Sequence, residues 1–83
     1  MYRVVLTKSA HKHFLNIDKR YTERVTEALL SLEQDPYAGK QLKGKLHGIY
    51  SLRVWPYRIL YTIEQKKLIV FVLDIAHRQG VYQ

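Results

Sequence analysis

The chain has 83 residues, of which 47% are apolar and 12% aromatic, a content typical of one small folded domain rather than a disordered chain. The absence of cysteine excludes disulfides and thiolate metal sites. Fourteen Lys and Arg against seven Asp and Glu leave a formal charge of +7, which favours a nucleic acid or an acidic protein as partner. No apolar run resembles a signal peptide or a membrane span, so we expect a single cytoplasmic domain over residues 1–83.

The first part of the chain predicts a strand and then two helices. The β-branched run Tyr2–Leu6 indicates a strand, after which the hydroxyl of Thr7 or Ser9 can cap a short helix. Asp18 is the expected cap of a second helix, which ends between Glu33 and Asp35 because Pro36 follows. Apolar residues recur along it at helical spacing: Tyr21, Val25, Ala28, Leu29 and Leu32. The short junction between the helices predicts an antiparallel helical hairpin.

The segment Pro36–Gly48 has no clean periodicity and predicts a surface loop, with room for one helical turn. Its basic side chains are Lys40, Lys43, Lys45 and His47. Charge alone leaves two interpretations open for them, a solvated connection or a rim that contacts phosphates beside the sheet.

Three apolar runs then predict three strands, Ile49–Val54, Tyr57–Ile63 and Leu68–Ile75. Trp55–Pro56 is long enough only for a tight turn, and Glu64–Lys67 forms a compact polar connection. The last run is apolar on both faces, which indicates a central strand that pairs with its hairpin neighbour and with the N-terminal strand. The expected fold class is therefore α+β, in the order β-α-α-β-β-β, with a small, twisted, mainly antiparallel sheet packed against the helical hairpin.

The tight turn at Trp55–Pro56 places Arg53 opposite Arg58 on one face of the hairpin. Like charges at this spacing cost stability, and a guanidinium stays charged at any physiological pH. An RNA phosphate between the two side chains would turn this cost into a binding site. The alternative is a carboxylate, either from Asp74 or from an acidic partner.

Other catalytic chemistries find little support in the residues. His11 and His13 lie on a helix at a spacing that turns their rings apart, so we expect both to be surface residues. No glycine-rich phosphate loop precedes a helix, Ser9 and Ser51 have no evident base, and the carboxylates are not paired. The remaining cations, imidazoles and tyrosines suit cleavage of an RNA phosphodiester, for which the substrate supplies its own 2′-hydroxyl as nucleophile.

The ordered segments Tyr50–Val54, Tyr57–Tyr61, Val70–Asp74, His77–Arg78 and Val81–Tyr82 resemble the RelE branch of the RelE/ParE toxin superfamily. The resemblance covers essentially the whole chain. It implies a toxin that cuts messenger RNA on the ribosome without a metal or cofactor and leaves a 2′,3′-cyclic phosphate and a 5′-hydroxyl. It also implies a cognate antitoxin, for which an acidic, partly disordered protein would suit the charge of this chain, and contact with operator DNA only through the toxin–antitoxin complex.

The resemblance also implies roles for individual side chains of a catalytic site. Arg53 is expected at the scissile phosphate, where it can orient the 2′-hydroxyl, and Arg58 is expected to stabilise the transition-state phosphate. Arg78 is expected to support the leaving side, and Tyr82 to stack on a base or orient it. We expect His77 to be the general acid, because an imidazole titrates near neutrality. Beside these catalytic residues, the side chains expected to contact RNA or the ribosome are Lys40, Lys43, Lys45, His47, Ser51 and Trp55.

Purely structural roles stay open for three of these side chains. His77 can cap a carbonyl at the end of a strand, Arg78 can form a salt bridge with Asp74, and Tyr82 can pack the terminus.

The chain departs from the family pattern at two places. Ser51 stands where many RelE-type members have a basic residue, which leaves the general base unassigned. Trp55–Pro56 replaces a Gly-Asp-like turn, and its indole can stack on a base, pack on the turn or bind the antitoxin. Two other functions therefore stay open, a ParE-type inhibitor of DNA gyrase and an inactive member that keeps only antitoxin binding or operator co-repression.

Overall fold

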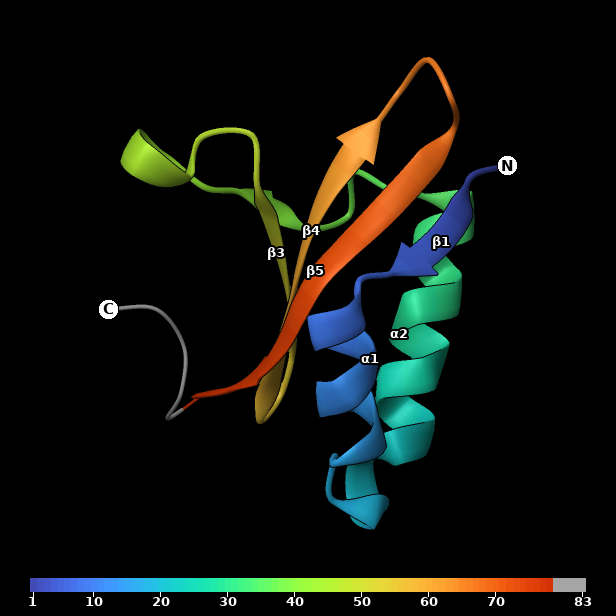
Figure 1. Ribbon diagram of the computed structural model, residues 1–83, viewed down its shortest axis with the longest axis vertical. Helices are drawn as coiled ribbons and strands as arrows, with labels where there is room; N and C mark the ends of the chain where they lie inside the picture. The colour runs from blue at the N-terminus through green and yellow to red at the C-terminus, as the bar shows by residue number, and fades with distance from the viewer. Residues whose placement is uncertain (79–83) are drawn as a thin grey trace.

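A computed structural model describes residues 1–78 as two helices packed on one face of a five-stranded sheet (Figure 1). The elements follow one another as β1 (Arg3–Leu6), α1 (Lys8–Leu15), η1 (Lys19–Tyr21), α2 (Thr22–Gln34), β2 (Lys40–Gln41), η2 (Gly44–Leu46), β3 (Tyr50–Val54), β4 (Tyr57–Glu64) and β5 (Ile69–His77), where η denotes a short 3-10 helix. The strand order across the sheet is β1-β5-β4-β3-β2, with β1 parallel to β5 and the other pairs antiparallel. The predicted α+β class, the helical pair and the central position of the last strand are confirmed.

The predicted cap of the first helix is present at Thr7, whereas the predicted cap of the second helix, Asp18, begins the short helix η1 and α2 itself begins at Thr22 without a side-chain cap. The Thr7 hydroxyl accepts from the amide of Ala10 at 3.2 Å and donates to the carbonyl of Leu73 at 3.0 Å, so it both caps α1 and ties it to β5. Ser9 lies inside the helix instead. Asp18 caps η1, which leads directly into α2, and its pKa is lowered because Arg20 donates hydrogen bonds to it. None of the helices in the described part of the chain is long and apolar enough to cross a membrane.

The core lies between the helices and one face of the sheet. β4 alternates strictly, so Ile59 and Tyr61 are fully buried on the helix side together with Val70 and Val72 of β5. Neither α1 nor α2 covers the opposite face (Figure 1). We call it the open face, and by strand register it presents Lys40, Ser51, Arg53, Arg58, Leu60 and Thr62.

The segment 36–48 contains a strand that its sequence does not predict. β2 pairs with β3 through only two residues, Lys40 opposite Ser51 and Gln41 opposite Tyr50. So short a strand has no periodicity to read, and its pairing depends on contacts made from elsewhere in the fold. The helical turn for which the segment has room is present as η2.

A shift in the pairing register of β4 with β5 is the second feature of the fold that the sequence does not predict. Tyr61 lies opposite Val72 but Leu60 lies opposite Asp74, so β5 carries one extra residue, Leu73, at this point. The extra residue reverses the alternation of β5 beyond it, because successive side chains of a strand point to opposite faces. β5 also continues to His77, two residues beyond the predicted end.

Candidate nucleic-acid interface

The predicted pair of guanidinium groups is present on the open face. Arg53 and Arg58 are direct partners across β3 and β4, with Arg53 exposed and Arg58 half-buried. The Nη1 atom of Arg58 donates to the hydroxyl of Ser51 at 3.5 Å, and the Ser51 residue is only 5% exposed. Within residues 1–78 neither arginine forms an ion pair with a carboxylate. No described carboxylate therefore compensates the two like charges, and an anion bound between them would relieve their repulsion.

A third cation of the open face comes from β2. Lys40 is the direct partner of Ser51, and residues opposite each other in an antiparallel pair project to the same face. The Lys40 residue is exposed. Lys40, Arg58 and Arg53 thus belong to three adjacent strands around one small, buried hydroxyl.

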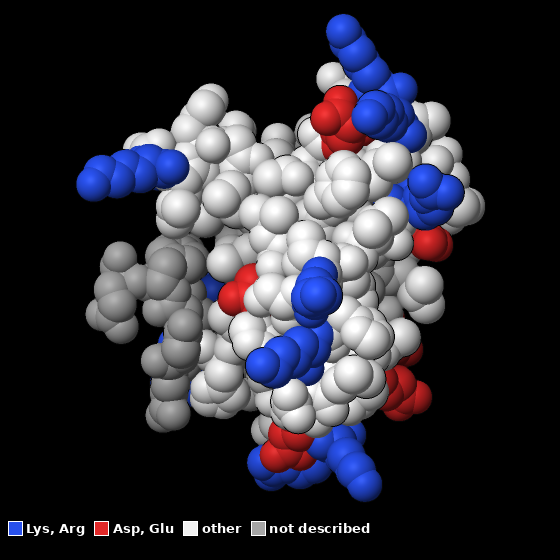
Figure 2. All heavy atoms as spheres, viewed as in Figure 1, with Lys and Arg blue, Asp and Glu red and all other residues white. Residues whose placement is uncertain are grey.

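The other basic residues of the predicted rim lie in and beside η2. Lys43, Lys45 and His47 are exposed, and they flank the sheet rather than belong to it. Figure 1 shows η2 projecting from the sheet on the side opposite the helices. In the same view, Lys and Arg side chains stand at the margin of the molecule and also near the middle of the visible face (Figure 2). These residues are thus placed to extend the open face outward and not to form its centre.

Arg78 lies against the turn that closes the arginine hairpin. Its guanidinium carbon is 4.9 Å from the centroid of the Trp55 ring, and its amide donates to the carbonyl of Pro56 at 2.8 Å. Arg24 donates to the carbonyl of Trp55 at 3.3 Å, and the Trp55–Pro56 peptide bond is cis. Trp55 is 55% exposed despite these contacts. The alternative of a salt bridge between Arg78 and Asp74 is wrong.

His77 does not join the arginines. It is the direct partner of Tyr57, and the two rings meet edge to face with centroids 5.3 Å apart, on the helix side of the sheet. Arg58 is the partner of Ala76 and projects to the open face. The extra residue in β5 is the cause, because an unbroken alternation from Val70 would have brought position 77 to the open face. The prediction that His77 shares a site with Arg58 is therefore corrected: the two side chains lie on opposite faces of the sheet. Tyr82, the last predicted member of the site, lies outside the described residues.

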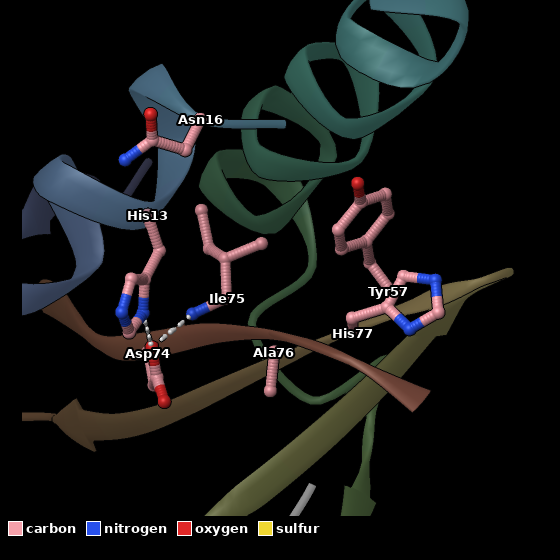
Figure 3. A pocket seen from close by; sticks show the side chains of 7 residues that line it. All are labelled: His13, Asn16, Tyr57, Asp74, Ile75, Ala76 and His77. Atoms are coloured by element: carbon pink, nitrogen blue, oxygen red, sulfur yellow. Dashed lines mark hydrogen bonds and ion pairs between the residues drawn. The ribbon is translucent and has the colours of Figure 1, made fainter. Parts of the chain in front are cut away.

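A pocket of about 370 Å³ opens beside the end of β5, on the α1 side (Figure 3). Its lining residues are His13, Asn16, Tyr57, Asp74, Ile75, Ala76 and His77. The Nδ1 atom of His13 lies 2.5 Å from a carboxylate oxygen of Asp74, which also accepts from the amide of Ile75 at 2.8 Å.

The contact between His13 and Asp74 changes two expectations. His11 and His13 are both exposed as predicted, but His13 binds a residue 61 positions away, a contact for which the sequence carries no signal. Asp74 is engaged by His13 and is not the carboxylate that neutralises Arg53 and Arg58. In residues 1–78 no group of three or more His, Cys, Asp or Glu is placed to hold a metal ion.

Comparison with known proteins gives the family. Residues 4–82 match the family model described as the ParE toxin of the type II toxin–antitoxin system parDE. The chain belongs to the RelE/ParE family of toxins. Its sequence is 32% identical over 84 residues to toxin RelG of Mycobacterium tuberculosis, covering 99% of this chain and 97% of the relative. The resemblance read from the ordered segments of the sequence is thereby confirmed at the level of the family.

Solved structures of RelE/ParE toxins share the fold. A RelBE toxin–antitoxin complex from Mycobacterium tuberculosis is similar with a TM-score of 0.86 and 32% identity, over 93% of this chain and 98% of that one. The archaeal RelE–RelB complex from Pyrococcus horikoshii is similar with a TM-score of 0.79 and 26% identity, over 93% and 94% of the two chains. Both relatives were solved as complexes of a toxin with its antitoxin.

Proposed function

We propose that this toxin is an endoribonuclease that cuts messenger RNA in the A site of the translating ribosome. The observation that carries the proposal is the pair Arg53 and Arg58, which face each other on the open face without a carboxylate within residues 1–78. Such a pair destabilises the free protein and is useful when a phosphate occupies the space between the side chains. Family membership supports the same class of target, since the similar proteins are named as RelG and RelE toxins.

The reaction needs a phosphate held in line with the neighbouring 2′-hydroxyl. As the 2′-oxygen bonds to phosphorus and the bond to the 5′-oxygen breaks, negative charge grows on the non-bridging oxygens and on the leaving oxygen. Arg58, held by Ser51, is placed to stabilise the non-bridging oxygens, and the more exposed Arg53 to orient the phosphate for attack. Arg78, beside the turn, is assigned to the leaving side. The 2′-hydroxyl gives a proton to water and the 5′-oxygen takes one from water, since no side chain is assigned as base or acid. The products are a 2′,3′-cyclic phosphate and a 5′-hydroxyl, and no metal or cofactor is assigned a role.

The remaining predicted residues have supporting roles in this proposal. Trp55 offers an exposed ring for contact with a base, and the η2 rim with Lys43, Lys45 and His47 is assigned to the RNA backbone or to ribosomal RNA. Tyr82 keeps its predicted role at a base. His77 is not assigned as the general acid, since it lies on the other face of the sheet from Arg58.

We further propose that an acidic antitoxin covers the open face in the cytoplasm, and that the chain meets operator DNA only within that complex. The formal charge of +7 and the uncompensated arginines are complementary to an acidic segment. The toxin–antitoxin complexes of similar proteins support this kind of partner.

The decisive experiment compares Arg58→Ala with the wild type in a translating extract, with transcript ends mapped by primer extension. We expect the variant to lose about 100-fold or more in cleavage rate, because it removes a preorganised charge from the transition state. Arg3→Ala is the matched control, since Arg3 is exposed on β1 at the other edge of the sheet and should leave cleavage unchanged. Intact transcripts in the presence of the folded wild-type protein would refute the proposal.

A second candidate function is inhibition of DNA gyrase. The family model that matches this chain is described by ParE toxins, which favours it. The convergent cations of the open face argue against it, because a protein-binding inhibitor does not require them. Gyrase-dependent DNA breaks with unchanged transcripts would identify this function. Absence of toxicity with antitoxin binding retained would instead identify an inactive member.

A further inference from the structure

We propose that Lys40 is a phosphate-binding residue of the open face that replaces the basic residue missing at Ser51, and that Tyr61 is the residue that positions it. The inference rests on the proposed RNA cleavage and assigns one more cation and its support to the same site. Lys40 belongs to β2, the strand of two residues that the sequence does not predict. Tyr61 carries a buried hydroxyl that has no role in the cleavage reaction proposed above.

Tyr61 holds the segment that leads into β2. Its side chain is fully buried, and its hydroxyl donates to the carbonyl of Pro36 at 2.8 Å and accepts from the amide of Gly39 at 2.9 Å. Burial raises the pKa of Tyr61, so the phenol stays protonated and keeps donating throughout the neutral range. One side chain thus binds both ends of the turn between α2 and β2.

Gly39 shows how closely this turn is held. A Cβ atom added there would lie 2.5 Å from the Tyr61 hydroxyl oxygen and 3.0 Å from the carbonyl oxygen of Ser51. At 2.5 Å a Cβ atom would overlap the Tyr61 hydroxyl, so any side chain at this position would have to displace Tyr61 or the backbone of β3. The next residue in the chain is Lys40, which therefore enters β2 directly opposite Ser51.

The register then determines what Lys40 can reach. Opposite residues of an antiparallel pair have Cβ atoms about 4.5–5.5 Å apart on the same face, so the Lys40 stem starts next to the Ser51 hydroxyl. Arg58 reaches the same hydroxyl from β4. A phosphate above Ser51 would meet the ammonium group of Lys40 from one side and the guanidinium of Arg58 from the other. Lysine suits this position, because its flexible stem carries a compact charge that follows the phosphate as the reaction proceeds.

The first test substitutes Lys40, which is exposed, so its variants are expected to fold like the wild type. Lys40→Ala should lose about tenfold or more in the cleavage rate, and Lys40→Arg should recover most of it. The control Lys66→Ala removes an exposed lysine from the β4–β5 turn and should stay within about twofold of the wild type. Equal rates for Lys40→Ala and Lys66→Ala would overturn the inference and leave the proposed function intact.

A binding measurement separates this inference from failure of the proposed function. The probe is a short single-stranded RNA, and its affinity for each variant is followed against salt concentration. Loss of one phosphate contact in Lys40→Ala should reduce the slope of log affinity against log salt by about 0.7, with no change in Lys66→Ala. An unchanged slope in Lys40→Ala would overturn the assignment even if the wild-type protein cleaves no RNA.

Moving the lysine from position 40 to position 51 tests whether Lys40 takes the place of a basic residue at Ser51. In the double variant Lys40→Ala/Ser51→Lys the cation moves across the strand pair to the position opposite, and cleavage should rise above that of Lys40→Ala alone. A double variant that melts like the wild type but stays as slow as Lys40→Ala would overturn the replacement of a basic residue at Ser51. If the double variant does not fold, the comparison of Lys40→Arg with Lys40→Ala decides whether the charge is needed.

The role of Tyr61 is tested with Tyr61→Phe, which keeps the ring and removes only the hydroxyl. We expect cleavage to fall about three- to tenfold when Lys40 is present and not to fall further in the Lys40→Ala background. Tyr57→Phe is the matched control, because that hydroxyl accepts from the amide of Asp18 far from β2. A loss that is equal in both backgrounds, or equal to that of Tyr57→Phe, would show a general structural role and overturn the positioning of Lys40 by Tyr61.

Discussion

The two faces of the sheet differ more than any other two regions of this toxin, although the same strands build both. Ile59 is fully buried under the helices, and its neighbour Arg58 projects to the open face beside a second guanidinium. The helix side gathers the apolar area that stabilises the domain, whereas the open face keeps like charges together at a cost in stability. Strand alternation thus places the apolar core on one face of the sheet and the opposed arginines on the other.

The largest expected effect on stability comes from the helix side. Ile59→Ala should lower the free energy of unfolding by about 2–5 kcal/mol, because it leaves a cavity in a fully buried site. Urea denaturation followed by circular dichroism would measure the loss. A change below about 0.5 kcal/mol, the range of ordinary surface substitutions, would show that the helix side does not carry the stability.

An intermediate effect on the free energy of unfolding is expected at the turn before β2, which is held by Tyr61 and leads to Lys40 of the open face. Gly39→Ala should cost about 1–3 kcal/mol, since the new methyl group overlaps the hydroxyl of Tyr61 and the backbone of Ser51. The same substitution in the Tyr61→Phe background should cost less, because the nearer of the two atoms is gone. Equal costs in both backgrounds, measured in the same denaturation experiment, would contradict the contact.

The smallest effect is expected on the open face. Arg53→Ala should not lower the free energy of unfolding by more than about 0.5 kcal/mol. It can raise this free energy by up to about 1 kcal/mol, because it removes one of two opposed like charges. The gain should be larger at low salt than at high salt, where screening already weakens the repulsion. A clear loss of stability at low salt would mean that Arg53 supports the fold rather than a ligand.

Much of the fold is predictable because it depends on local pattern. The spacing of apolar residues predicts both helices and the strands β1, β3, β4 and β5. Thr7 predicts where α1 begins and Pro36 where α2 ends, whereas Asp18 caps η1, one short turn before α2. The tight turn at Trp55–Pro56 is enough to predict that Arg53 faces Arg58, which is the centre of the candidate site. Over such short distances along the chain, neighbouring residues determine the geometry.

The rest of the candidate site depends on contacts between distant residues. Tyr61 binds the turn at Gly39, 22 positions away, and β2 follows this turn directly with Lys40 opposite Ser51. The pair of His13 with Asp74 spans 61 positions and removes a carboxylate that could have neutralised the arginines. None of these pairings leaves a periodic trace in the sequence.

The sequence by itself determined the family, the order of elements and the opposed arginines, because periodicity, caps and a two-residue turn are local properties. Only the tertiary structure decided which other side chains accompany them. One extra residue in β5 turns His77 to the helix side, and the pairing of β2 with β3 places Lys40 opposite Ser51. Strand register and the closure of long loops are set by packing of the whole domain, so residues far apart in the chain are brought together only when the core forms.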